Sequence, residues 1–171
     1  MYIRHMPKIY YLFMLLIVFV SCKDNKVILE DGQESEWGMV VNQLPVKIAL
    51  NAKSQTIVND WKAFKTFDTS FDRMYDATYR EDLVLIIEDL VENQKALEVS
   101  KYPAQFDIPQ VKGRQKVLKT FILKTKGDLE YRQDPKVSME QMITAYNSLR
   151  NQFNVEVNNT LLEELILSES N

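Results

Sequence analysis

The sequence predicts an all-α protein whose helices form an up-down-up-down four-helix bundle. Apolar residues recur at steps of three and four in four separate segments, which is the period of a helix buried along one side. The four prolines after residue 40 lie where these segments begin or end, and no long stretch shows the apolar–polar alternation of a strand. A three-helix core with a docked N-terminal arm is the alternative arrangement.

The first two helices are predicted over residues 45–75 and 78–99. Thr78 and Glu81 have the spacing of a capping box, in which two side chains bond each other's main-chain amides at the start of a helix. The predicted inward positions are Ile57, Trp61, Phe64, Phe67, Phe71 and Met74 in the first helix, and Leu83, Ile86, Ile87, Leu90, Val91, Gln94 and Leu97 in the second.

The third helix is predicted over residues 110–132, and the fourth starts with Asp134 as its cap and Pro135 at the first helical position. Gly113 and Gly127 lie inside the third helix, where each costs about 1 kcal/mol relative to alanine, so we expect a close helix contact or a bend. The predicted inward positions are Val111, Leu118, Ile122, Thr125 and Leu129, then Met139, Met142, Tyr146, Leu149, Phe153, Val157, Leu161 and Leu165.

The connections between these helices are short enough to reverse the chain each time. They fall near residue 76, over residues 101–109 and near residue 134. Short connections place successive helices antiparallel, which predicts the bundle topology. We also expect the fourth helix to break near Asn158 and Asn159, with Thr160 and Glu163 capping a new start.

Residues 1–21 have the anatomy of an export signal. Arg4 and Lys8 make the first eight residues basic, and an uninterrupted apolar and aromatic run extends from Ile9 to Val20 before the small Ser21. Twelve residues of helix cover only about 18 Å, against roughly 30 Å of membrane hydrocarbon. The run therefore predicts a cleaved signal rather than a stable membrane span.

The sequence Phe19-Val20-Ser21-Cys22, followed by Lys23 and Asp24, resembles the lipobox of bacterial lipoproteins of the Bacteroidota type. The resemblance implies that Cys22 is acylated and becomes the first residue of the mature chain. It also implies an outer-membrane location, with the periplasmic and surface faces both open. An ordinary signal cleaved beside a free cysteine is the alternative.

Three regions follow from this organisation: a signal peptide over residues 1–21, a tether over residues 22–44 and a helical bundle domain over residues 45–171. The tether is acidic up to Glu36 and contains Gly32. Its last part is too apolar for a simple linker, so we expect it to dock partly on the domain as an arm; these apolar residues are Trp37, Met39, Val40, Val41 and Leu44.

Composition argues against several functions. Arg4 and Lys8 are lost with the signal, so 19 of the 21 basic residues remain against 24 acidic ones and the net charge changes from −3 to −5, which disfavours nucleic-acid binding. His5 and Cys22 are the only histidine and cysteine. Catalytic triads, thiol nucleophiles, haem axial histidines and Glu-x-x-His metal sites are therefore not expected in the domain, and we expect neither enzymatic activity nor a cofactor.

Metal handling is the alternative function. Met74 ends the first helix and Met139 and Met142 begin the fourth, so antiparallel packing places three thioethers at one end, where they suit monovalent copper or simply fill the core. Asp68, Asp72 and Asp76 lie at four-residue spacing on one helix face and suggest a divalent cation. The simpler interpretation of the aspartates is a solvated face offset by nearby basic residues.

A basic stripe on the third helix is the strongest surface candidate for a partner. Residues 110–126 contain six basic residues and no acid, and the candidate contact residues are Lys112, Arg114, Lys116 and Lys119. Such a stripe attracts lipid headgroups or an acidic protein, or it pairs with the acidic second helix. We therefore expect a lipid-anchored envelope protein that works as a binding, scaffold or accessory subunit, with no nucleic-acid partner.

Overall fold

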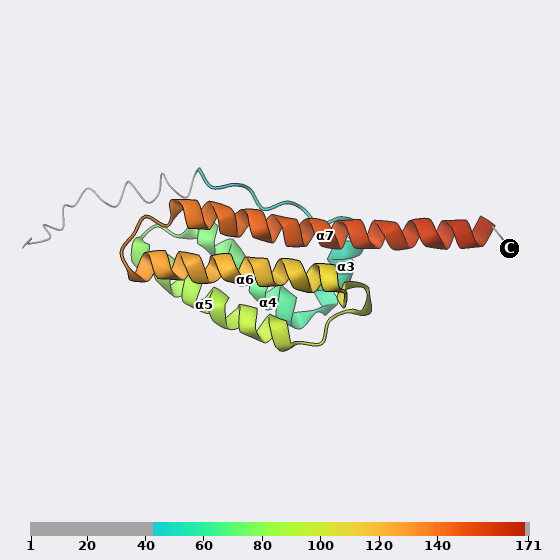
Figure 1. Ribbon diagram of the computed structural model, residues 1–171, viewed down its shortest axis with the longest axis horizontal. Coiled ribbons are helices and arrows are strands. Elements are labelled where there is room, and N and C mark those ends of the chain that lie inside the picture. The colour runs from blue at the N-terminus through green and yellow to red at the C-terminus, as the bar shows by residue number, and fades with distance from the viewer. Residues whose placement is uncertain (1–42, 170–171) are drawn as a thin grey trace, which may run out of the picture. The chain divides into compact units, whose positions relative to one another are not determined.

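The computed structural model describes residues 43–169, with side-chain surroundings described for residues 43–159 (Figure 1). Every regular element in this range is helical, which confirms the all-α prediction. The elements in chain order are α3 (Ala52–Asp60), α4 (Lys62–Asp72), the 3-10 helix η1 (Arg73–Asp76), α5 (Arg80–Val99), the 3-10 helix η2 (Ala104–Phe106), α6 (Pro109–Glu130) and α7 (Lys136–Glu169). Within residues 43–169, no helix combines the length and apolar character needed to cross a bilayer.

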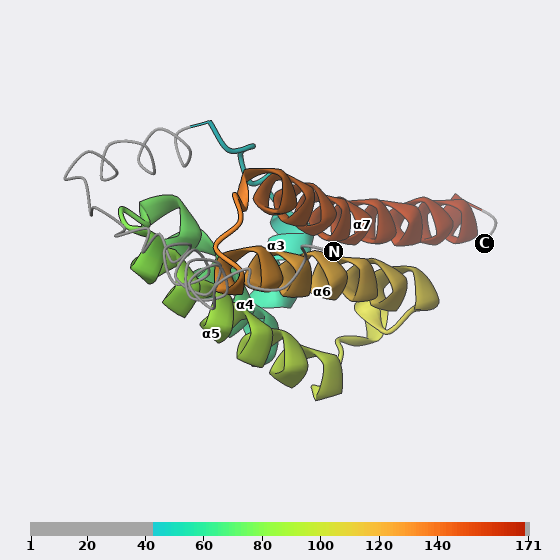
Figure 2. The ribbon, with the colours of Figure 1, turned by 60° about the vertical axis from the view of Figure 1, so that its left-hand side comes forward.

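Cross-helix contacts show that consecutive long helices run antiparallel. Between α4 and α5, Asn93 donates to the Ser70 hydroxyl at 2.7 Å, and Trp61 donates to the Ser100 hydroxyl at 2.9 Å. As the residue number rises on one helix, it falls on the other. Helices α4 and α5 therefore run antiparallel, and both are seen in Figure 2.

The same reversal relates α6 to α7, and α7 to α4. Arg114 and Lys124 on α6 donate to Gln152 and Gln141 on α7, at 2.9 and 2.8 Å. On the other side, Phe64 and Phe71 of α4 contact Phe153 and Tyr146 of α7, with ring centroids 5.2 and 4.1 Å apart. Helix α7 therefore packs against both α6 and α4.

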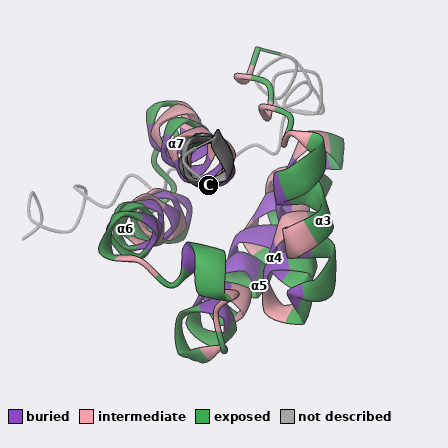
Figure 3. Ribbon diagram, turned by 90° about the vertical axis from the view of Figure 1, so that its right-hand side faces the viewer, coloured by how far each residue is buried: buried purple, intermediate pink, exposed green. Residues whose placement is uncertain are grey.

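One hydrophobic core lies between these helices, and their buried faces turn toward it (Figure 3). Its largest members are aromatic, and the fully buried ones are Phe64, Phe67, Phe71, Phe106, Tyr146 and Phe153. Except for Ile57, which is half-buried, all the predicted inward positions up to Val157 are buried. Polar side chains are buried as well, and among the described residues Ser54, Gln94 and Gln115 carry buried polar atoms without a hydrogen-bond partner; in Gln94 both amide atoms lack one.

The prediction of one continuous first helix is wrong. Residues 45–51 are extended, and the helix that starts at Ala52 is interrupted at Trp61, which adopts φ −91° and ψ 86°. The indole donates to Ser100 and packs against the Tyr102 ring at a centroid distance of 4.8 Å. These partners are some forty residues away in the chain, so the local period could not reveal the interruption.

Two helix boundaries also differ from the prediction. At the start of α5 the reciprocal bond is shifted by one residue, because the Asp82 carboxylate, rather than Glu81, accepts from the Tyr79 amide at 3.3 Å. The predicted break near Asn158 is absent, and α7 continues to Glu169. The predicted capping role of Asp134 is confirmed, since its carboxylate accepts from the Lys136 amide at 2.9 Å, whereas α7 starts at Lys136, one residue after the predicted Pro135.

The helical glycines are not explained by close packing. A Cβ placed on Gly113 or Gly127 meets nothing within 4 Å, and neither residue has a positive φ. Gly113→Ala and Gly127→Ala are therefore each expected to raise the free energy of unfolding by about 1 kcal/mol, the usual gain in helix propensity. Urea denaturation measures the change, and the exposed Ala96→Gly on α5 should show a loss of similar size. A loss of stability in either alanine variant would contradict the open space around these glycines.

Candidate functional site

The extended segment of residues 45–51, called the arm below, lies along one face of α7. Asn147 accepts from the Ile48 amide at 2.9 Å and donates to the Val46 carbonyl at 2.9 Å. Asn154 accepts from the Asn51 amide at 2.8 Å and donates to the Ala49 carbonyl at 3.1 Å. Each asparagine thus pairs with one amide and one carbonyl of the arm, as a neighbouring strand would.

Arg150 lies between the two asparagines and completes the row, called the α7 ladder below. Its Nε donates to the Ile48 carbonyl at 2.7 Å. Steps of three and four residues place Asn147, Arg150 and Asn154 on one face of the helix. All five of these bonds go to main-chain atoms of the arm, so the α7 ladder recognises an extended backbone whatever its side chains.

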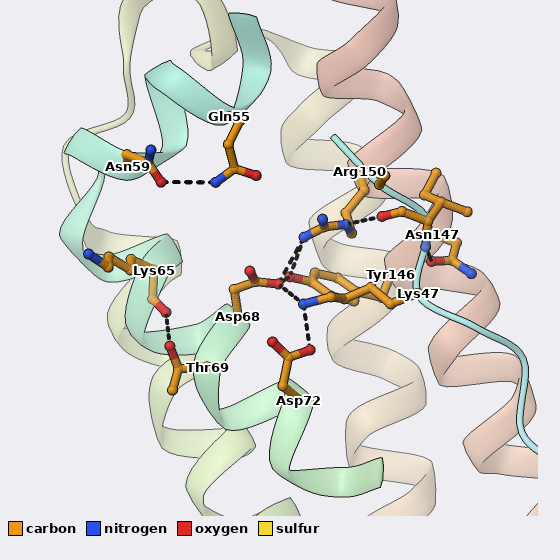
Figure 4. A network of polar contacts seen from close by, with 12 residues as sticks. Lys47, Gln55, Asn59, Lys65, Asp68, Thr69, Asp72, Tyr146, Asn147 and Arg150 are labelled. Atoms are coloured by element: carbon orange, nitrogen blue, oxygen red, sulfur yellow. Dashed lines mark hydrogen bonds and ion pairs between the residues drawn. The ribbon is translucent and has the colours of Figure 1, made fainter. Parts of the chain in front are cut away.

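One side chain of the arm, that of Lys47, enters a pocket formed by Asp68 and Asp72 of α4 (Figure 4). Its ammonium lies 2.9 Å from Asp68 Oδ1 and 2.5 Å from Asp72 Oδ1. Asp68 Oδ1 also accepts from Arg150 at 2.8 Å and from the Tyr146 hydroxyl. Two cations therefore face two carboxylates, and the Arg150 side chain is only 5% exposed.

Two tyrosines also belong to the site: Tyr146 contacts Asp68, and Tyr75 contacts the start of the arm. Tyr146 is fully buried, and burial, followed by the negative charge of Asp68, raises the pKa of its hydroxyl well above the usual value. Tyr75 donates to the Pro45 carbonyl at 2.9 Å, and burial followed by Asp72 raises its pKa as well. Both hydroxyls therefore remain protonated donors at neutral pH.

The raised pKa of Tyr146 predicts a loss of stability in alkali. The folded protein holds this proton more tightly than the unfolded chain, whose tyrosines titrate near about pH 10. The free energy of unfolding should therefore be independent of this group below about pH 10 and should fall above it, by up to about 1.4 kcal/mol per pH unit. Urea unfolding between about pH 8 and 11 measures the slope. Tyr146→Phe should flatten the slope, and a variant that keeps the full slope would contradict the prediction.

The three predicted methionine ligands are all fully buried. Met74 lies in η1, and Met139 and Met142 lie in the first turns of α7. All three belong to the single hydrophobic core, among leucine, isoleucine and aromatic side chains. These methionines are therefore placed as side chains that fill the core, which was the simpler interpretation of the sequence.

The predicted aspartate stripe does not act as one cluster. Asp68 and Asp72 bind Lys47, while Asp76 is exposed at the end of η1. Among the residues that the structure describes, no group of three or more acidic, histidine or cysteine side chains has the arrangement of a metal site. The cations that neutralise this face are Lys47 and Arg150, which sequence reasoning did not connect with it.

The predicted basic stripe is divided among several partners. Lys119 pairs with Glu98 of α5 at 2.5 Å, Lys112 pairs with Asp107 in the preceding connection, and Arg114 donates to Gln152. Lys116 is exposed, and none of the acidic residues in the described range pairs with it. The four residues therefore form a partly neutralised surface rather than one continuous positive face.

Two open hollows flank the Ser100–Lys101 corner, with volumes of about 460 and 440 Å³. Tyr102 and Lys112 line the first, and Trp61 and Asn93 line the second. Neither hollow contains a buried charged group aimed into it. We therefore place the candidate site at the arm and the α7 ladder.

Sequence reasoning named Asp68 and Asp72 but missed Lys47 and the α7 ladder, although one signal for the ladder was present. Asparagine is a poor helix former, yet it recurs at residues 147, 151, 154 and 158 of one long predicted helix. Such spacing on one face indicates side chains kept for hydrogen bonding. Cys22 and most of the predicted tether lie outside the described residues; of the tether's apolar residues only Leu44 is described, and it packs against the core.

Comparison with known proteins gives no relative: no family model, curated protein or solved structure matches this chain.

Proposed function

We propose that this chain is a lipid-anchored protein of the bacterial cell envelope that acts as a binding, scaffold or accessory subunit. The lipobox-like sequence ending at Cys22 supports acylation and a location at the outer membrane. The arm is the structural observation that carries the proposal. It follows the tether directly, and it is fastened to α7 by five hydrogen bonds to its main chain and to α4 by a partly buried ion pair, as suits a domain held by its N-terminal end.

The proposal includes the finer architecture. Helices α4 to α7 are taken to form an up-down-up-down four-helix bundle, because each long helix runs antiparallel to its packing neighbours. A helical bundle held by its N-terminal end can present binding surfaces without chemistry of its own. The absence of histidine and cysteine after Cys22 agrees with a role based on contact.

Metabolic labelling with a palmitate analogue, followed by membrane fractionation, tests the anchor. The wild-type chain should carry the label and remain with the outer membrane, and Cys22→Ala should do neither. Ser21→Ala is the matched control, because it alters the neighbouring residue while keeping a small side chain and the acylated thiol. An unlabelled wild-type chain, or label retained in Cys22→Ala, would overturn the anchor.

A further inference from the structure

We infer that the α7 ladder and the Lys47 pocket form a binding groove for an extended, lysine-containing peptide, and that the arm of a second copy of this chain fills it in trans. In the single chain the groove is closed by the molecule's own arm. A second copy of the chain would thus be the partner in the proposed binding role, and this proposal rests on that proposed function.

The ladder supplies affinity that does not depend on the side chains of the bound segment. Asn147 and Asn154 each offer one acceptor and one donor to the bound backbone, and Arg150 adds a further donor. This is the hydrogen-bonding logic of strand addition, carried out by a helix face. A bound segment needs only an extended backbone with free amides at the positions of Ile48 and Asn51.

Selectivity comes from positions that face inward at every third residue. Leu44 and Leu50 pack against the core, and Lys47 between them enters the acidic pocket. Val46 is 84% exposed and contributes no selectivity. The preferred ligand is therefore an extended segment with a lysine three residues from an apolar residue on each side.

The arm of a second copy is the segment already known to fit. The arm precedes α3, whose N-cap is Asn51, so once the bond from the Asn51 amide to Asn154 is released the arm leaves its groove by turning at this residue without opening a helix. Two copies can therefore exchange arms without either chain passing through a loop of the other. Acylated copies confined to one membrane also meet at high effective concentration, which favours exchange.

Two complementary variants of the detergent-solubilised full chain test the inference. Lys47→Ala with Ile48→Pro weakens the arm and leaves the groove intact, because proline removes the amide that Asn147 binds. Asn147→Ala with Asn154→Ala disables the groove and leaves the arm intact. The probe is a labelled peptide with the sequence of residues 43–51, and fluorescence anisotropy measures its binding to each variant and to the wild type.

The arm-weakened variant should bind the peptide, and the groove-disabled variant should not. If the native arm is closed about 99% of the time, the wild type should bind it about 100-fold more weakly than the arm-weakened variant. Mixing the two variants should give a 1:1 complex in sedimentation velocity. Peptide carrying Lys47→Ala should bind at least about tenfold more weakly, because it lacks the ammonium that enters the acidic pocket.

Failure of the arm-weakened variant to bind the peptide, while circular dichroism and melting show it to be folded, would overturn the groove. If that variant is unfolded, Ile48→Pro alone replaces it under the same criterion. Peptide binding without a complex between the two variants would overturn the second copy as the occupant. Because peptide binding and complex formation in detergent need no membrane, their failure would leave acylation at Cys22, which the labelling experiment tests, unaffected.

Discussion

Asp68→Ala is expected to lower the free energy of unfolding by about 3 to 5 kcal/mol. The carboxylate accepts from Arg150 and from Tyr146, and both of these residues are buried. Removing it leaves a buried guanidinium without its ion-pair partner and a buried hydroxyl without an acceptor. Chemical denaturation monitored by circular dichroism measures the loss.

Asp72→Ala provides the matched control, because Asp72 lies four residues after Asp68 on the same helix and binds the same lysine, Lys47. Its side chain is 54% exposed, against 26% for Asp68. Exposed ion pairs contribute at most about 1 kcal/mol, so Asp72→Ala should change stability by no more than that. Equal effects of the two substitutions would show that Asp68 does not organise the buried network.

Phe153→Ala is expected to cost about 3 to 5 kcal/mol, the range observed when a large buried aromatic side chain is removed. The ring stacks on Phe106 with centroids 4.3 Å apart and meets the edge of Phe64 at 5.2 Å. It also contacts Trp61 at 6.2 Å, so one side chain joins α7 to α4, to η2 and to the interruption between α3 and α4. Alanine would therefore leave a cavity lined by Phe64, Phe106 and Trp61, and filling it would require all three of these side chains to shift together.

The control for this prediction is Val155→Ala, two residues further along the same helix. Val155 is 40% exposed, and its truncation should cost less than about 1 kcal/mol. Both variants are compared with the wild type by urea denaturation and by thermal melting. A cost below about 2 kcal/mol for Phe153→Ala would mean that the aromatic cluster collapses readily around the missing ring.

The helices were predictable because burial follows a local period. Phe64, Phe67 and Phe71 recur at helical steps, and each of them faces the core. The caps were less secure: the Asp134 cap is where the sequence places it, whereas the capping interaction of α5 is shifted by one residue. Neighbouring polar residues compete for such roles with energies that differ by fractions of a kcal/mol.

The site was not predictable in the same way, because the bonds between the arm and α7 join residues about a hundred positions apart. Ile48 and Leu50 lie within the predicted first helix, yet asparagines on α7 hold this stretch extended. The main-chain groups that α7 binds are therefore withdrawn from helix formation. Similarly, Asp68 and Asp72 suggested a cation site from their spacing alone, and the cations that meet them come from Lys47 and Arg150.

The direction in which the arm lies on α7 determines how the domain would withstand a pulling force applied through the residues before Pro45. Val46 bonds to Asn147 and Asn51 to Asn154, so the two backbones run parallel. A force drawn along the helix axis shears all of these bonds at once, whereas a force directed away from the helix peels them one after another from Pro45 onward. Complete peeling frees seven residues and lengthens the reach of the domain by at most about 25 Å.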